Sequence, residues 1–150
     1  MLLFAIFLLP IAIYAIPVGE TLRNAVSQMG SEQTVGIRGQ LMCGNSYLTN
    51  TKVKLWDEDS GPDPDDLLAE AFTNDTGYFE ISGTQKEVTN IDPRFNIYHS
   101  CGKKSSSCKR KVTFTIPDKY ISNGNKVEKW MEFGRLNMEI ITKGEQPYCL

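Results

Sequence analysis

Four cysteines and one histidine are the side chains of this 150-residue chain most able to form covalent bonds or bind metal. An even number of cysteines suggests disulfides, and four of them allow three pairings. Cys101 and Cys108 enclose a short polar segment suited to a hairpin tip, so we expect them to be bonded to each other. Cys43 is then expected to be bonded to Cys149. No cysteine pair has CxxC spacing and His99 is the only histidine, so we predict no zinc site.

A second group of side chains is cationic and lies within nine residues. It comprises Lys103, Lys104, Lys109, Arg110 and Lys111. We expect these side chains to be exposed, because unpaired cations are costly to bury. Anionic lipid headgroups, sulfated glycans or an acidic protein surface would complement them. The alternative is a solvated hairpin that protects a sheet edge. The net charge of the whole chain is −2, which gives no case for nucleic acid.

An acidic loop offers six carboxylates: Asp57, Glu58, Asp59, Asp63, Asp65 and Asp66. An EF-hand calcium loop requires glycine at its sixth position, which holds Pro62 when counted from Asp57. A looser calcium site stays open as an alternative. We favour a local interpretation, in which Asp63 caps a helical turn that begins at Pro64 and ends at Leu68.

One N-glycosylation sequon is present, Asn74-Asp75-Thr76, which makes Asn74 a candidate glycan acceptor. The same residues, followed by Gly77, predict a tight turn between two strands, because glycine accepts a positive φ. A glycan at such a turn would point into solvent.

Strands are the elements that must position these groups. Apolar and polar residues alternate with a period of two, which is typical of half-buried strands. We expect strands over residues 35–43, 52–56, 69–73, 78–82, 94–99, 112–116 and 136–140. About seven short strands with turn signals between them predict an all-β fold, an antiparallel β-sandwich. We expect Phe79 and Ile81 to face the core, and His99 to have a structural role.

The N-terminal region predicts export. Residues 1–15 carry no charged side chain and are too short to span a bilayer comfortably. We interpret them as a signal peptide cleaved after Ala15, with an uncleaved signal anchor as the alternative. Residues 16–34 are expected to form an N-terminal arm, and residues 35–150 a single domain that is not transmembrane after cleavage. Disulfides fit a secreted protein.

A series of motifs in order resembles the nematode transthyretin-like family. They are Gly39-Gln40-Leu41-Met42-Cys43, the strand KVKLWD, the loop GPDPDDLL, Asn74-Asp75-Thr76-Gly77-Tyr78-Phe79, Ile91-Asp92-Pro93, Tyr98-His99-Ser100-Cys101 and Lys109-Arg110-Lys111-Val112. The resemblance implies a transthyretin-like, prealbumin-type sandwich.

The same fold also houses hydrolases of 5-hydroxyisourate, whose sites resemble two histidines, an arginine and a C-terminal Tyr-Arg-Gly-Ser. Here His99 is the only histidine and the chain ends Gln-Pro-Tyr-Cys-Leu. We therefore expect no enzyme, no catalytic residues and no cofactor.

The expected function is that of a secreted extracellular binding or signalling protein. Its partner would be an extracellular protein or cell-surface receptor of unknown identity, reached in extracellular fluid or at cell surfaces. One alternative is a carrier of a small hydrophobic or hormone-like ligand. Another is an adaptor that binds anionic lipid headgroups or glycans through the basic hairpin tip.

Overall fold

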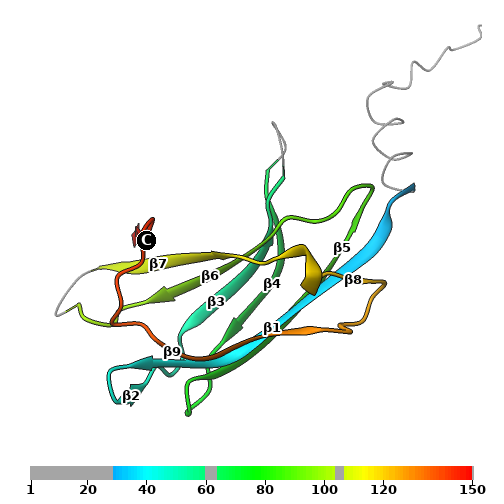
Figure 1. Ribbon diagram of the computed structural model, residues 1–150. Helices are drawn as coiled ribbons and strands as arrows, with labels where there is room; N and C mark the ends of the chain where they lie inside the picture. Colours follow the sequence, from blue (N-terminus) through cyan, green and yellow to red (C-terminus); the bar gives the residue numbers. More distant parts are fainter. Residues whose placement is uncertain (1–28, 60–63, 104–106, 150) are drawn as a thin grey trace, which may run out of the picture.

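The structure is a computed structural model that describes residues 29–59, 64–103 and 107–149 (Figure 1). The expected signal peptide, most of the N-terminal arm and Lys104 lie outside the described residues. The elements are β1 (Ser31–Cys43), β2 (Ser46–Tyr47), β3 (Lys52–Asp57), β4 (Asp66–Phe72), β5 (Tyr78–Glu87), β6 (Pro93–His99), β7 (Cys108–Thr115), η1 (Asp118–Tyr120), β8 (Ser122–Asn123), β9 (Trp130–Asn137) and β10 (Gln146–Cys149). None of the described residues belongs to a helix long and apolar enough to cross a membrane.

The strands form two five-stranded sheets packed as a sandwich, as the alternation predicted (Figure 1). In sheet A, the long strand β1 pairs with β2, β5 and β8 in antiparallel fashion and with β9 in parallel. In sheet B, the strand order is β10-β7-β6-β3-β4 and every neighbour is antiparallel. Strand β1 begins at Ser31, so the last residues of the expected arm belong to the sheet.

The core lies between the sheets and follows the predicted faces. Phe79 and Ile81 on β5 are buried while Tyr78 and Glu80 are exposed, as expected for a period of two. Phe79 stacks on Phe95 of β6 with ring centroids 5.1 Å apart, which joins sheet A to sheet B. Such offset aromatic pairs add about 0.5–1.5 kcal/mol beyond the area they bury.

The predicted turn before β5 is confirmed. Gly77 has φ +70°, and a Cβ there would lie 2.4 Å from the carbonyl oxygen of Leu41. Any larger residue would be strained and would collide with β1. The Asn74 Oδ1 accepts hydrogen bonds from the backbone N–H groups of Thr76 and Tyr78, each at 2.9 Å.

Two predicted elements are wrong. The helical turn after the acidic loop is absent, and β4 begins at Asp66 instead, because pairing with β3 outweighs the local cap signal. The final strand expected at 136–140 is β9, which ends at Asn137, and a separate β10 follows. The aliphatic Ile140 lies in the connecting segment and is exposed rather than in a strand.

Candidate functional site

The four cysteines form two disulfides, but not in the expected pairing. Cys43 is bonded to Cys101 and Cys108 to Cys149. The first bridge ties the end of β1 to Cys101, the second residue after β6, and so connects sheet A to sheet B. The second lies within sheet B, where Cys108 and Cys149 are directly opposed on β7 and β10. Cys101 and Cys108 are near in sequence, but Cys101, just after β6, meets the end of β1, whereas Cys108 on β7 meets β10.

The cationic side chains expected to form one exposed tip do not lie together on one surface. The prediction that Arg110 is exposed is wrong, because the residue is buried and only 7% exposed. Strand β7 extends back to Cys108, so Arg110 shares the inward face with Val112 while Lys109 and Lys111 point outward. The alternation of Val112 and Phe114, continued two residues earlier, would have revealed this. Lys103 is exposed and donates to the carbonyl oxygen of Cys108 at 3.3 Å.

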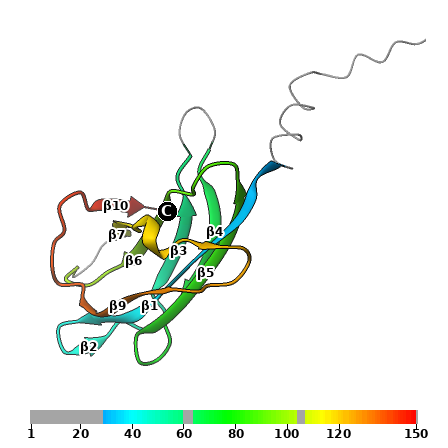
Figure 2. The same cartoon turned by 45° about the vertical axis from the view of Figure 1, so that its right-hand side comes forward.

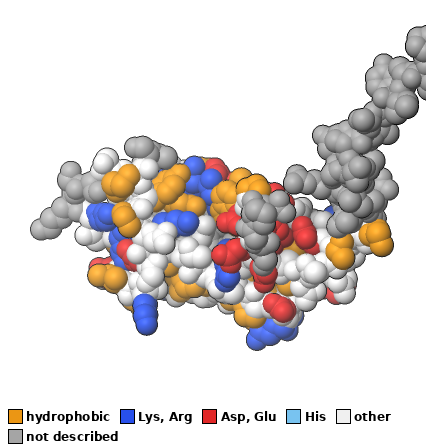
Figure 3. Space-filling view, turned by 90° about the horizontal axis from the view of Figure 1, so that it is seen from above, with side chains coloured by type: hydrophobic (Ala, Val, Ile, Leu, Met, Phe, Trp, Pro, Cys, Tyr) orange, Lys and Arg blue, Asp and Glu red, His pale blue; other side chains and the backbone are white. Residues whose placement is uncertain are grey.

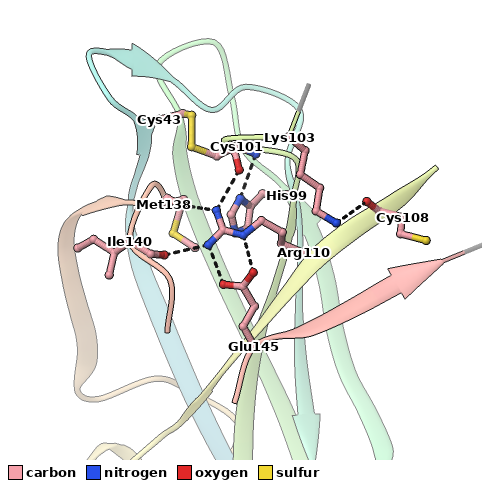
Figure 4. Close-up of polar contacts among 9 residues, drawn as sticks. All are labelled: Cys43, His99, Cys101, Lys103, Cys108, Arg110, Met138, Ile140 and Glu145. Carbon is pink, nitrogen blue, oxygen red and sulfur yellow. Dashed lines mark hydrogen bonds and ion pairs between the residues drawn. A yellow bond between two sulfur atoms is a disulfide. The ribbon is translucent and has the colours of Figure 1, made fainter. Parts of the chain in front are cut away.

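Arg110 is the centre of a buried polar cluster at one end of the sandwich (Figure 4). Its Nη1 donates to the carbonyl oxygens of Cys101 at 2.9 Å and Met138 at 2.8 Å. Its Nη2 donates to the carbonyl oxygen of Ile140 at 3.0 Å. These carbonyls belong to segments that lack strand partners at this point, so the guanidinium supplies the donors they need.

Glu145 balances the charge of Arg110. The carboxylate accepts two parallel hydrogen bonds, 2.5 Å from Arg110 Nε and 2.7 Å from Nη2. This fork geometry is among the strongest charge-assisted arrangements in proteins. It raises the pKa of Arg110 and lowers the pKa of Glu145, in both cases chiefly through the hydrogen bonds between them. The pair holds the Met138–Glu145 segment against the end of the sandwich.

His99 is buried and lies beside this cluster (Figure 4). It is 2% exposed, and its Nδ1 accepts the backbone N–H of Cys101 at 3.2 Å. An accepting Nδ1 places the proton of the neutral ring on Nε2. Burial, followed by the charge of Arg110, lowers the pKa of His99 from 6.5 to about 4. The ring is therefore neutral at physiological pH and turned toward the chain's own backbone.

This shifted pKa predicts an acid-sensitive fold. As the pH falls from 6.5 to about 4, the unfolded chain binds a proton at His99 that the folded chain does not. The corresponding loss in the free energy of unfolding is about 3 kcal/mol. Urea titrations of the wild type and His99→Gln across this range give the contribution by difference, since glutamine does not titrate. Parallel curves for the two proteins would contradict the assignment.

The acidic loop places three carboxylates together. Asp57, Asp59 and Glu87 have oxygens within 4.8 Å of one another. Burial is the main cause that raises the pKa of Asp57 and of Glu87. Asp57 Oδ1 also accepts the backbone N–H of Asp92 at 2.7 Å, which anchors the segment before β6. Glu87 lies at the end of β5, distant in sequence from the acidic loop. Its position close to Asp57 and Asp59 could not be predicted from the sequence pattern.

The sequon residue Asn74 is exposed at the turn before β5. Its Oδ1 is used by the turn, as described above, and also accepts from Thr76 Oγ1 at 2.9 Å. The hydrogen bonds from Thr76 and Tyr78 to this side chain all use Oδ1, not the side-chain nitrogen that carries a glycan. Glycosylation there stays a prediction.

Comparisons with a family model and with curated proteins point to the same family. The family model described as "Transthyretin-like family" matches residues 38–117. Transthyretin-like protein 33 of Caenorhabditis elegans is 46% identical over 81% of this chain and 88% of its own length. Transthyretin-like protein 5 of the same organism is 43% identical over 85% and 91% of the two chains.

A further relative, transthyretin-like protein 46 of Caenorhabditis elegans, is 41% identical over 77% of this chain, which spans 65% of that protein. The region matched by the family model contains the end of β1, all of β2 to β7, and both cysteines of the inter-sheet bridge. The chain belongs to the transthyretin-like family.

Proposed function

We propose that this chain is a secreted, non-enzymatic binding or signalling protein that acts in extracellular fluid or at cell surfaces. The observation that carries the proposal is the state of His99. A general base needs an accessible ring nitrogen near the proton it removes. His99 offers Nδ1 to its own backbone and keeps Nε2 buried without a hydrogen-bond partner.

Two disulfides support the extracellular location, because such bonds persist mainly in oxidising compartments. The apolar residues 1–15 support export, as a cleaved signal peptide. The partner we propose is an extracellular protein or cell-surface receptor. A compact sandwich crossed by a covalent bridge presents a rigid surface, which loses little entropy on binding.

A carrier function is less well supported. The outer face of β1 would line a ligand channel between subunits, yet its polar side chains are already paired. Arg38 contacts Glu132 and Glu80, and Gln40 Oε1 accepts a hydrogen bond from Arg135. These groups would lose their partners, or bury charge, if an apolar ligand lay over them.

An adaptor that binds an anionic partner is supported by Lys109 and Lys111. Both lie on the outward face of β7, and neither has an ion-pair partner among the described residues. Unpaired cations held on a strand are available to an anionic ligand at no cost of breaking an existing ion pair. Lys103, by contrast, already donates to the backbone.

The test of the proposal uses the purified mature protein in two assays. Incubation with 5-hydroxyisourate should give no turnover above the spontaneous rate, for the wild type and for His99→Gln alike. In the second assay the same protein is immobilised as bait and exposed to extracellular fluid and membrane extracts. It should retain a partner whose binding is saturable and is displaced by excess free protein. Turnover by the wild type that is lost in His99→Gln would overturn the proposal, as would the absence of any displaceable partner.

A further inference from the structure

The outer face of sheet B presents a row of side chains that crosses four strands. The backbone register places Lys52 of β3 opposite Tyr98 of β6, Tyr98 opposite Lys111 of β7, and Lys111 opposite Gln146 of β10. Neighbouring strands are about 4.8 Å apart, so the two lysines are separated by about 10 Å across the sheet. Cation and aromatic ring therefore alternate along a straight line at right angles to the strands.

This face carries an excess of positive charge. Five cations point outward: Lys52, Lys54, Arg94, Lys109 and Lys111. Three carboxylates lie among them: Glu58, Asp65 and Glu70. Five minus three leaves an excess of two, in a chain whose net charge is −2. The excess is concentrated on β7, because Lys52 and Lys54 share Glu70 at 3.5 and 3.1 Å, and Arg94 donates to Glu58 at 2.6 Å.

A groove of about 480 Å³ opens on this face beside Lys111. Two of its wall residues, Asn96 and Tyr98, are only 6% and 5% exposed although they point away from the core. Thr113 Oγ1 donates to Asn96 Oδ1 at 2.7 Å, which orients the amide. This part of the groove wall, Asn96 and Tyr98, is thus already held in place, as in a preformed binding site.

Aromatic and amide groups complete the wall. Trp56 lines the groove, and its indole Nε1 has no hydrogen-bond partner. Tyr98 packs edge-on against Tyr148 of β10, with ring centroids 4.7 Å apart. Gln146 adds a second amide at the β10 side. Aromatic rings pack on the apolar faces of sugar rings, and amides and hydroxyls bond to sugar hydroxyl groups.

We propose that this groove binds an acidic glycan, a polysaccharide that carries sulfate or uronate groups. Lys111 in the groove binds an anionic group, Trp56 packs against a sugar ring, and Asn96 bonds to a ring hydroxyl. Lys109 lies outside the groove lining, two residues along β7 on the same outward face, and binds a further anionic group of an extended chain. The inference rests on the proposed binding function and places the anion site on the face of sheet B, not on the tip that Lys103 and Lys104 were expected to form.

The lining favours a glycan over a lipid headgroup at a membrane surface. Binding to a bilayer surface is driven largely by apolar side chains that enter the boundary below the headgroups. The groove is lined by aromatic, charged, amide and threonine side chains and one glycine, and its lining contains no aliphatic side chain. Figure 3 views the molecule from above and shows acidic side chains gathered in one area of this view, with Lys and Arg both beside this area and farther from it.

The experiment is a titration of the mature, disulfide-bonded protein, labelled with nitrogen-15, with a sulfated heparin hexasaccharide. Backbone shifts are expected to cluster in β3, β6, β7 and β10. Lys111→Gln should weaken binding about fivefold, the effect of one ion pair of about 1 kcal/mol. Lys126→Gln is the matched control, an exposed lysine on the segment between β8 and β9, and should leave the affinity unchanged.

Two further measurements distinguish a glycan site from nonspecific attraction between opposite charges. Thr113→Val releases Asn96 without changing any charge, so it should weaken hexasaccharide binding and leave tripolyphosphate binding unchanged. The desulfated hexasaccharide and phosphatidylserine vesicles should bind more weakly than the sulfated form.

Equal losses for Lys111→Gln and Lys126→Gln, shifts confined to the segment between β6 and β7, or a preference for the vesicles would each overturn the glycan assignment. If the hexasaccharide does not bind while the bait retains a protein partner, this inference fails and the proposed function stands.

Discussion

Replacing Arg110 by alanine is expected to lower the free energy of unfolding by about 3–5 kcal/mol. The substitution leaves Glu145 as a largely buried charge without its partner. It also leaves the carbonyl oxygens of Cys101, Met138 and Ile140 without the donor that now serves them. Each buried acceptor without a donor carries a desolvation cost of its own. Urea unfolding of the two proteins at neutral pH measures the difference.

Lys109→Ala is the matched control, because Lys109 is adjacent on the same strand and points outward. Its cost should stay within about 0.5 kcal/mol, as is usual for surface substitutions. The double variant Arg110→Met with Glu145→Leu should recover part of the loss, since it removes both charges and keeps apolar volume. An Arg110→Ala protein no less stable than Lys109→Ala would show that the cluster does not hold this end of the sandwich.

The second large effect is expected from the inter-sheet disulfide. Changing Cys43 and Cys101 together to serine should cost about 4 kcal/mol, because the bridge closes a loop with a sequence separation of 58 residues. The bridge between Cys108 and Cys149 closes a loop of similar length, with a separation of 41, so the entropy term is nearly equal. Cys101 is buried in the core cluster, however, whereas the other bridge lies at a sheet edge.

We therefore expect the Cys43–Cys101 double variant to be the less stable of the two disulfide variants. Urea unfolding without reductant compares them, and peptide mapping of the unreduced wild type checks the pairing first. Recovery of a Cys101–Cys108 peptide, or a larger loss from Cys108→Ser with Cys149→Ser, would contradict this account.

Sequence pattern predicted the parts of the fold that depend on local alternation. The buried face of β5 follows from Phe79 and Ile81, because only one side of that strand alternates as apolar. The turn before β5 follows from Gly77, whose positive φ excludes most other residues. These features can be predicted from the sequence because each depends on residues only a few positions apart.

The errors concern features decided by distant segments. The disulfide pairing depends on which strand ends meet, and nearness in sequence made Cys101 and Cys108 a false pair. Arg110 was grouped with its neighbours by charge, although the period of the strand separates it from Lys109 and Lys111. Its partner Glu145 is 35 residues away in a segment without a strand pattern. The start of β4 was masked by a local cap signal that pairing with β3 overrides.

The bridge between β7 and β10 has a consequence for self-association. Strand β10 is one edge of sheet B and lies beside β7 (Figure 2). The disulfide from Cys149 fastens it to Cys108 directly opposite. An edge that is covalently fastened cannot peel away, so β7 is not exposed as a template for another copy of the chain. The other edge, β4, has no such lock, and its Leu67 and Phe72 are 47% and 50% exposed. If chains of this protein ever join sheet to sheet through sheet B, the seam should form along β4, where only the bulge opposite Leu55 and Trp56 interrupts the regular pairing.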